Sequence, residues 1–174
     1  MKIALVAMLF AASALAQTPS SAPLAACGPD QVIFNVSPGG SQQTPAQPEP
    51  GKATVYFIQD NGPMGNTLHS TLRIGLDGAW VGAYQQNSYL SVSVVPGEHH
   101  VCANVQPGFS IEQPVALAHF TAEPGGIYYF RTLFLAEITT QYPTAPHLDI
   151  HPLDSDEGKY LIASYPLSVA TAKK

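Results

Sequence analysis

The sequence predicts an all-β protein, an antiparallel β-sandwich of about seven to eight strands with one short C-terminal helix. Three observations favour this class. Charged residues make up only 11% of the chain, which leaves little material for the solvated faces of helices. Glycine and proline are plentiful, with 14 and 16 residues. Between them, the strand formers Val, Ile, Tyr, Phe and Thr cluster in short runs, as expected of strands separated by turns.

The strands are expected to follow one another from residue 53 onward. ATVYFIQ (53–59) is strongly apolar, which indicates a central strand. Asp77-Gly78 separates two further runs and is typical of a two-residue type I′ hairpin turn. In YLSVSVV (89–95) large apolar residues alternate with Tyr and Ser, which predicts one buried face. The expected strands are 53–59, 71–76, 79–84, 89–95, 98–105, 115–122, 127–135 and a weaker 147–150, with 31–36 as a candidate before them.

The C-terminal end changes character. DSDEGKYLIASYP (154–166) offers Asp154 or Ser155 as an N-cap, acidic residues in the first turn and Pro166 as a stop. These are the signals of a short helix. The final residues, VATAKK, are expected to be frayed.

The N-terminus has the pattern of a secretory signal peptide. Lys2 precedes an apolar run (3–14), and Ala14-Leu15-Ala16 is a small-x-small cleavage signal, so cleavage is expected near Ala16. No later apolar run reaches the roughly twenty residues of a membrane-spanning helix. The predicted organisation is therefore a signal peptide (1–16), an extended N-terminal arm and linker (17–51), a β-sandwich domain (52–167) and a flexible tail (168–174).

The charge balance restricts the class of partner. Loss of the signal peptide removes Lys2 and takes the formal net charge from −5 to −6. The remaining sequence has no basic stripe, which argues against nucleic acid and anionic lipid as partners.

Cys27 and Cys102 are predicted to form one disulfide. Two cysteines with no other evident role most often pair in an oxidising compartment. The alternative is a lipoprotein, because Leu24-Ala25-Ala26-Cys27 is similar to a lipobox. A lipobox should adjoin the apolar run, whereas polar, proline-containing residues intervene here. Acylation of Cys27 would also leave Cys102 without a partner.

The stretch EHHVCANV (98–105) places two histidines beside Cys102. The period of two in a strand turns His99 toward the core and His100 and Cys102 toward the opposite face. The adjacent histidines therefore cannot share a metal ion. A Cys–His catalytic pair would need an orienting group that the sequence does not identify. We expect the disulfide to fasten the arm across the outside of the sheet, and His99 to bond to backbone at the edge of the core.

Five segments, in this order, resemble a bacterial envelope family, domain-of-unknown-function family 2846. They are GKATVYFIQD, LDGAWVGA, SVVPGEHHVCA, GGIYYFR and DSDEGKYLI, within residues 51–167. Asp77-Gly78, Gly82 and Pro96-Gly97-x-His99-x-Val101 are also similar to PEGA-type surface modules. Both resemblances imply a small extracytoplasmic β-sandwich, and neither implies a catalytic residue. The arm and the cysteine pair lie outside the general pattern.

His147-Leu148-Asp149-Ile150-His151 is the pattern closest to a metal site. His147, Asp149 and His151 share one face of a strand, and two histidines with a carboxylate can hold zinc or iron. The simpler interpretation is an edge strand between Pro146 and Pro152, and we expect no stoichiometric metal and no cofactor. Trp80, Tyr84 and Tyr89 could stack on a sugar, although aromatic residues on strands more often pack in the core. The sequence contains no G-x-S-x-G, phosphate-binding Gly loop or H-E-x-x-H, so we expect no enzyme.

Alternating connections predict where a binding surface lies. If consecutive strands are antiparallel, the loops 60–70, 85–87, 106–114 and 139–146 gather at one end, opposite the short turns. Met64, His69, Phe109 and Tyr142 would form a binding surface there. The sequence thus indicates a secreted or periplasmic non-enzymatic module of the cell envelope, binding an unknown envelope protein or a glycan. The alternatives are a lipoprotein anchored through Cys27 and a metal-dependent activity at His147, Asp149 and His151.

Overall fold

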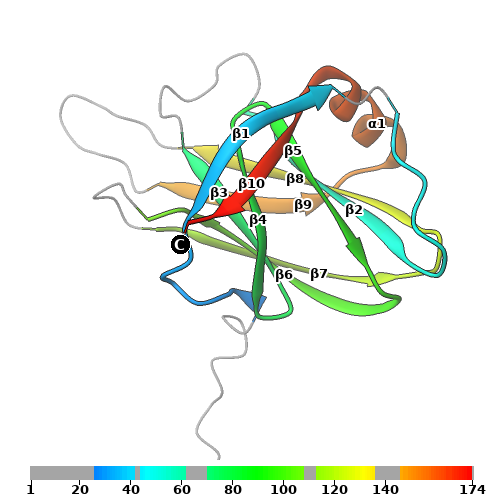
Figure 1. The fold of residues 1–174 in the computed structure, drawn as a ribbon, viewed down its shortest axis with the longest axis horizontal. Helices are drawn as coiled ribbons and strands as arrows, with labels where there is room; N and C mark the ends of the chain where they lie inside the picture. The colour runs from blue at the N-terminus through cyan, green and yellow to red at the C-terminus, as the bar shows by residue number, and fades with distance from the viewer. Residues whose placement is uncertain (1–25, 42–43, 62–69, 108–112, 136–145, 174) are drawn as a thin grey trace, which may run out of the picture.

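The protein is a two-sheet β-structure with one helix, as predicted (Figure 1). The computed structural model describes residues 26–41, 44–61, 70–107, 113–135 and 146–173. Within these ranges ten strands form one six-stranded and one four-stranded sheet, more than the seven to eight expected.

The six-stranded sheet is mixed rather than purely antiparallel. Its order is β1 (Phe34–Ser41), β10 (Pro166–Ala172), β5 (Ser88–Val94), β2 (Ala53–Gln59), β8 (Ile127–Leu135) and β9 (His147–Pro152). β2 is buried along its whole length, which confirms its central position. β2 and β8 pair in parallel, whereas β5, on the other side of β2, is antiparallel to it. β10 and β5 are the second parallel pair.

The four-stranded sheet is antiparallel throughout, in the order β4 (Ala79–Gln85), β3 (Thr71–Leu76), β6 (Gly97–Val105) and β7 (Val115–Ala122). Asp77 and Gly78 both have positive φ, 52° and 87°, as a type I′ turn requires. The main core lies between the two sheets and includes Phe57, Ile74, Leu90, Val101, Phe130 and Ile150.

The helix α1 (Ser155–Ser164) begins as predicted, with the Asp154 side chain accepting hydrogen bonds from the backbone N–H groups of Asp156 and Glu157. It covers a second apolar cluster on the outer face of the six-stranded sheet, built on Tyr56, Tyr89 and Tyr129. Gly158 sits against the Tyr129 ring, where a β-carbon would have no room. Close approach of the helix to the sheet thus accounts for a glycine inside it.

Two segments differ from the sequence expectation. Residues 37–41, expected as linker, form the second half of β1, and residues 168–172, expected as tail, belong to β10. The two strands pair antiparallel, with Phe34 opposite Ala172. β1 is an edge strand, where Pro38 removes no hydrogen bond from a second neighbour, so its Pro and Gly residues are tolerated. The folded body therefore extends beyond 52–167 at both ends.

Candidate functional site

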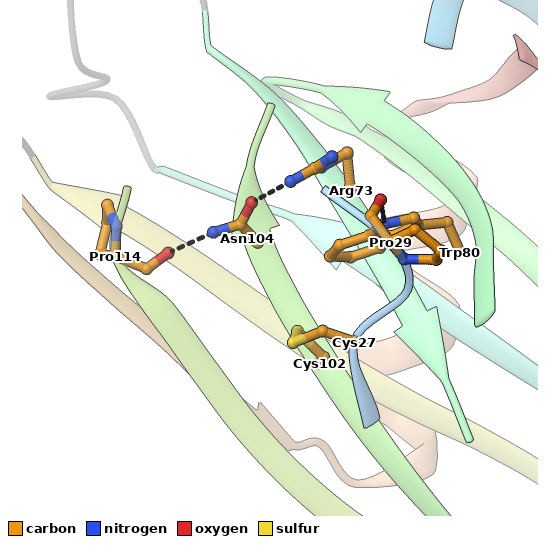
Figure 2. Close-up of a disulfide and its surroundings, with 7 residues drawn as sticks. All are labelled: Cys27, Pro29, Arg73, Trp80, Cys102, Asn104 and Pro114. Atoms are coloured by element: carbon orange, nitrogen blue, oxygen red, sulfur yellow. Dashed lines mark hydrogen bonds between the residues drawn. A yellow bond between two sulfur atoms is a disulfide. The ribbon is translucent and has the colours of Figure 1, made fainter. Parts of the chain in front are cut away.

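Cys27 and Cys102 form the predicted disulfide, with Cα atoms 5.1 Å apart and a sequence separation of 75 (Figure 2). Cys102 is buried in the middle of β6. The neighbouring β3 carries Gly75, whose added β-carbon would lie 2.7 Å from the Ala26 carbonyl oxygen. The missing side chain lets the arm lie flat on the sheet. The arm therefore crosses the outer face of the four-stranded sheet, as the sequence indicated.

Arg73 holds the arm beyond the disulfide, although it lies in the middle of β3 and is only 1% exposed. Its Nη1 donates to the carbonyl oxygens of Asp30 (3.0 Å) and Val32 (2.8 Å). Its Nη2 donates to Asn104 Oδ1 at 2.6 Å (Figure 2). Burial lowers the pKa of the guanidinium, and the charge of Asp30 opposes this. A charge buried on an outer face is stable here because the arm supplies its acceptors.

Trp80, on β4, also contacts the arm beside Arg73. Its indole Nε1 donates to the Pro29 carbonyl oxygen at 2.7 Å, and Gly28 packs on the indole where a side chain would not fit. Sequence reasoning missed both Arg73 and its role. The available signal was a lone charged residue inside an otherwise apolar strand, TLRIGL.

The three aromatic residues considered for sugar stacking do not form a shared platform. Trp80 packs against the arm and Arg73. Tyr84 is fully buried, its hydroxyl lies 2.8 Å from that of Thr132, and burial raises its pKa strongly. Tyr89 belongs to the second apolar cluster. All three pack within the fold, as aromatic residues on strands usually do.

His99 links two turns at one end of the sandwich. Its Nε2 lies 2.8 Å from the Val95 carbonyl oxygen, the predicted kind of backbone contact, and its Nδ1 lies 2.6 Å from Asp77 Oδ2. Both ring nitrogens face acceptors, which suits the protonated imidazole. Burial lowers the pKa of His99, but the contacts with Val95 and Asp77 outweigh it and raise that pKa above its ordinary value. The hydrogen bond from the His100 N–H and the contact with His99 hold the pKa of Asp77 below its ordinary value against the effect of burial.

His147, Asp149 and His151 lie on the outer side of the edge strand β9, while Leu148 and Ile150 enter the core. His151 Nδ1 lies 3.3 Å from Asp149 Oδ2, and the other carboxylate oxygen accepts from the Ile150 N–H. In the part of the chain that the structure describes, no group of three or more His, Cys, Asp or Glu residues is arranged to hold a metal ion.

Met64, His69, Phe109 and Tyr142 lie outside the described residues. The described strand ends on either side of these segments lie together at one end of the sandwich. The Gln106 N–H donates to the Thr71 carbonyl, and the Phe134 N–H donates to Asn61 Oδ1.

The short turns gather at the opposite end. The Asp77 carboxylate contacts His99 beside the Pro96-Gly97 turn, while Gly97 pairs with Ala122 at the start of the 123–126 turn. The described strand ends and turns therefore lie where the alternating connections predict.

A hollow of about 260 Å³ lies on the outer side of β2 and β5. The chain at 46–49, expected as plain linker, folds back over the sheet, and the Ala46 N–H donates to the Tyr56 hydroxyl at 2.8 Å. The lining is mixed, with hydroxyls, one carboxylate and two small apolar side chains, from Ala46, Gln47, Glu49, Thr54, Tyr56, Ser91, Val92 and Ser93.

The described residues contain no helix that is long and apolar enough to cross a membrane. Comparisons with protein-family models, curated proteins and solved structures give no match to this chain.

Proposed function

We propose that this protein is a secreted or periplasmic, non-enzymatic β-sandwich that serves the cell envelope as a binding or accessory module. The observation that carries the proposal is the Cys27–Cys102 disulfide. Disulfides persist in oxidising compartments outside the cytoplasm, and residues 1–16 have the pattern of a signal peptide. With its sulfur in a disulfide, Cys102 is no nucleophile for His100 to activate.

The arm favours this proposal over a lipoprotein. A lipid-bearing Cys27 would be the first residue of the mature chain, so Ala26 would be removed. Ala26 is buried, and its carbonyl oxygen accepts from the Gly78 N–H at 3.2 Å. Acylation would sacrifice both this contact and the disulfide.

Expression in a bacterium with a periplasm tests the proposal, with the full chain compared with a matched chain that lacks residues 2–16. Cells are fractionated, free thiols are trapped with an alkylating reagent, and intact mass is measured. We expect the full chain outside the cytoplasm, starting near Gln17, unlipidated and unalkylated. The matched chain should stay in the cytoplasm with both thiols alkylated. A full chain that remains cytoplasmic, or carries a diacylglycerol on Cys27, would refute the proposal.

A further inference from the structure

His100 and His119 face each other across two neighbouring strands. The register of β6 and β7 places them directly opposite, and their ring centroids are 6.5 Å apart. Both residues are exposed on the outer face of the four-stranded sheet, and the His100 side chain is 62% exposed. Neither ring is needed to fill the core or to join the disulfide, so both are available to a ligand from solvent.

The backbone under this pair is firmly held. β6 has a partner strand on each side, and the His100 N–H donates to Asp77 Oδ1 at 2.9 Å. Two residues further along the same face, Cys102 is tied to the arm. Because the strands are already fixed, only the two side chains need to be ordered when they capture a ligand between them.

The distance between the rings suits a shared metal ion. Metal–nitrogen bonds of about 2 Å hold two imidazoles of one ion with ring centroids roughly 5 to 6 Å apart. Small rotations of two exposed side chains therefore close the observed separation. Side chains at opposite positions of antiparallel strands have β-carbons only about 5 Å apart, so the backbone need not move.

The charge around the pair favours a cation. Glu98 Oε1 lies 3.8 Å from His100 Nε2, and the Glu98 side chain is also exposed. Neither β6 nor β7 contains a lysine or arginine that would repel a metal ion.

We propose that His100 and His119 form a surface site for one divalent transition-metal ion of the kind that imidazole prefers, Cu²⁺, Ni²⁺ or Zn²⁺. The two ring nitrogens are the protein ligands, water completes the coordination, and Glu98 contributes negative charge. The site does not depend on the proposed function, and it is separate from the histidines of β9.

Calorimetric titration of the untagged mature protein with Cu²⁺ and Ni²⁺ tests the proposal, with native mass spectrometry for stoichiometry. We expect one high-affinity ion per chain. His100→Ala and His119→Ala should each weaken binding roughly a hundredfold, because the remaining imidazole then binds the ion without a second ligand held at high effective concentration. Thermal unfolding without metal should be unchanged in both variants, since both side chains are exposed. With metal, Tm should rise in the wild type but in neither of these two variants, since the ion binds the pair only when the strands are folded.

The matched control is a His147→Ala/His151→Ala variant, which removes two histidines from the other sheet and should bind as the wild type does. The proposal fails if the wild type binds neither ion at up to millimolar concentration. It also fails if the His100→Ala/His119→Ala variant binds like the wild type, or if the control loses the ion instead.

Discussion

The Arg73 guanidinium carbon lies 4.2 Å from the centre of the Trp80 ring, and both side chains are covered by the N-terminal arm. This cation–π pair joins two adjacent strands of the four-stranded sheet, and its polar edges face the arm rather than water. The arm is thus a part of the folded body, and the charge beneath it depends on the arm remaining in place.

Arg73→Met should destabilise the protein by about 3 kcal/mol, because it leaves the carbonyl oxygens of Asp30 and Val32 and the Asn104 amide without their charged donor. Urea unfolding measures the change. Lys52→Met is the control, since the Lys52–Glu49 pair is exposed and should contribute at most about 0.5 kcal/mol. Equal effects of the two substitutions would contradict a structural role for Arg73.

A Cys27→Ser/Cys102→Ser variant should lose about 4 kcal/mol of stability, the chain-entropy contribution of a loop of 75 residues. Denaturant unfolding of the variant and of the oxidised wild type gives the difference. Reductant should destabilise the wild type and leave the variant unaffected. Free thiols in the native wild type, detected by alkylation and intact mass, would show that the disulfide does not form.

Truncation after Tyr165 should strongly destabilise the domain, because it removes β10 and leaves β1 without its partner. The buried contact between the Ser88 and Ser168 hydroxyls, 2.8 Å apart, is lost as well. Circular dichroism and thermal unfolding measure the effect. Truncation after Lys173 removes only the last residue and serves as the control. If both truncated proteins unfold at the wild-type temperature, residues 166–172 are a dispensable tail.

Asp77→Asn should change how stability depends on pH. The folded-state pKa of His99 is raised, so its contribution is full below its unfolded value of 6.5 and is lost as pH rises through the folded value. The pKa of Asp77 is lowered, so its contribution is present above 3.8 and is lost as pH falls through the folded value. Wild type and variant should therefore differ most between about pH 4 and 6.5.

Urea midpoints across pH 3 to 9 measure this difference. Asn also tolerates the positive φ of residue 77, so the turn itself is preserved. His147→Ala, at an exposed position on β9 in the other sheet, is the control and should follow the wild-type pH profile. A constant difference between Asp77→Asn and wild type over the whole range would rule out the ionic contact.

A Met64→Ala/Phe109→Ala/Tyr142→Ala variant should fold like the wild type and lose a partner that the wild type captures from envelope extract. Recognition by apolar residues within loops of a rigid scaffold is the physical reason. Cross-linking followed by pull-down is the measurement. A double alanine variant at Val95 and Leu117, which are exposed apolar residues beside the Pro96-Gly97 turn and in β7, is the control. Retained capture by the loop variant would leave these loops as connections.

Local patterns predicted the elements that local forces decide. The bounds of β2, β3, β7 and β8 agree with the predicted ranges, and the apolar runs of the first three end at clear turn residues. β1 was missed beyond residue 36 because Pro38 and Gly39 are strand breakers, and only its edge position makes them acceptable. β10 was missed because its sequence has only a weak strand pattern, and its pairing with β1 and β5 is what makes it a strand.

In the candidate sites, too, features decided locally could be predicted and features decided by distant contacts could not. The disulfide could be predicted because the sequence gives neither cysteine another role. The burial of His99 could be predicted because the alternation of the strand turns its side chain inward. The role of Arg73 could not, because its acceptors lie in an arm 41 to 43 residues away. The pairing of His100 with His119 depends on the exact register of β6 and β7, which a sequence pattern does not specify.

Because Phe34 pairs with Ala172, β1 cannot join its sheet until β10 has been synthesised. Among the strands that the structure describes, β1 leaves the ribosome first and its neighbour β10 leaves last, with Ala172 138 residues after Phe34. The disulfide likewise cannot form until Cys102 has been synthesised. Under the export proposed above, the chain crosses the membrane with β1 unpaired and the Cys27 thiol free. Oxidative folding and closure of the sheet become late events, open to chaperones, oxidants and wrong partners until the final residues arrive.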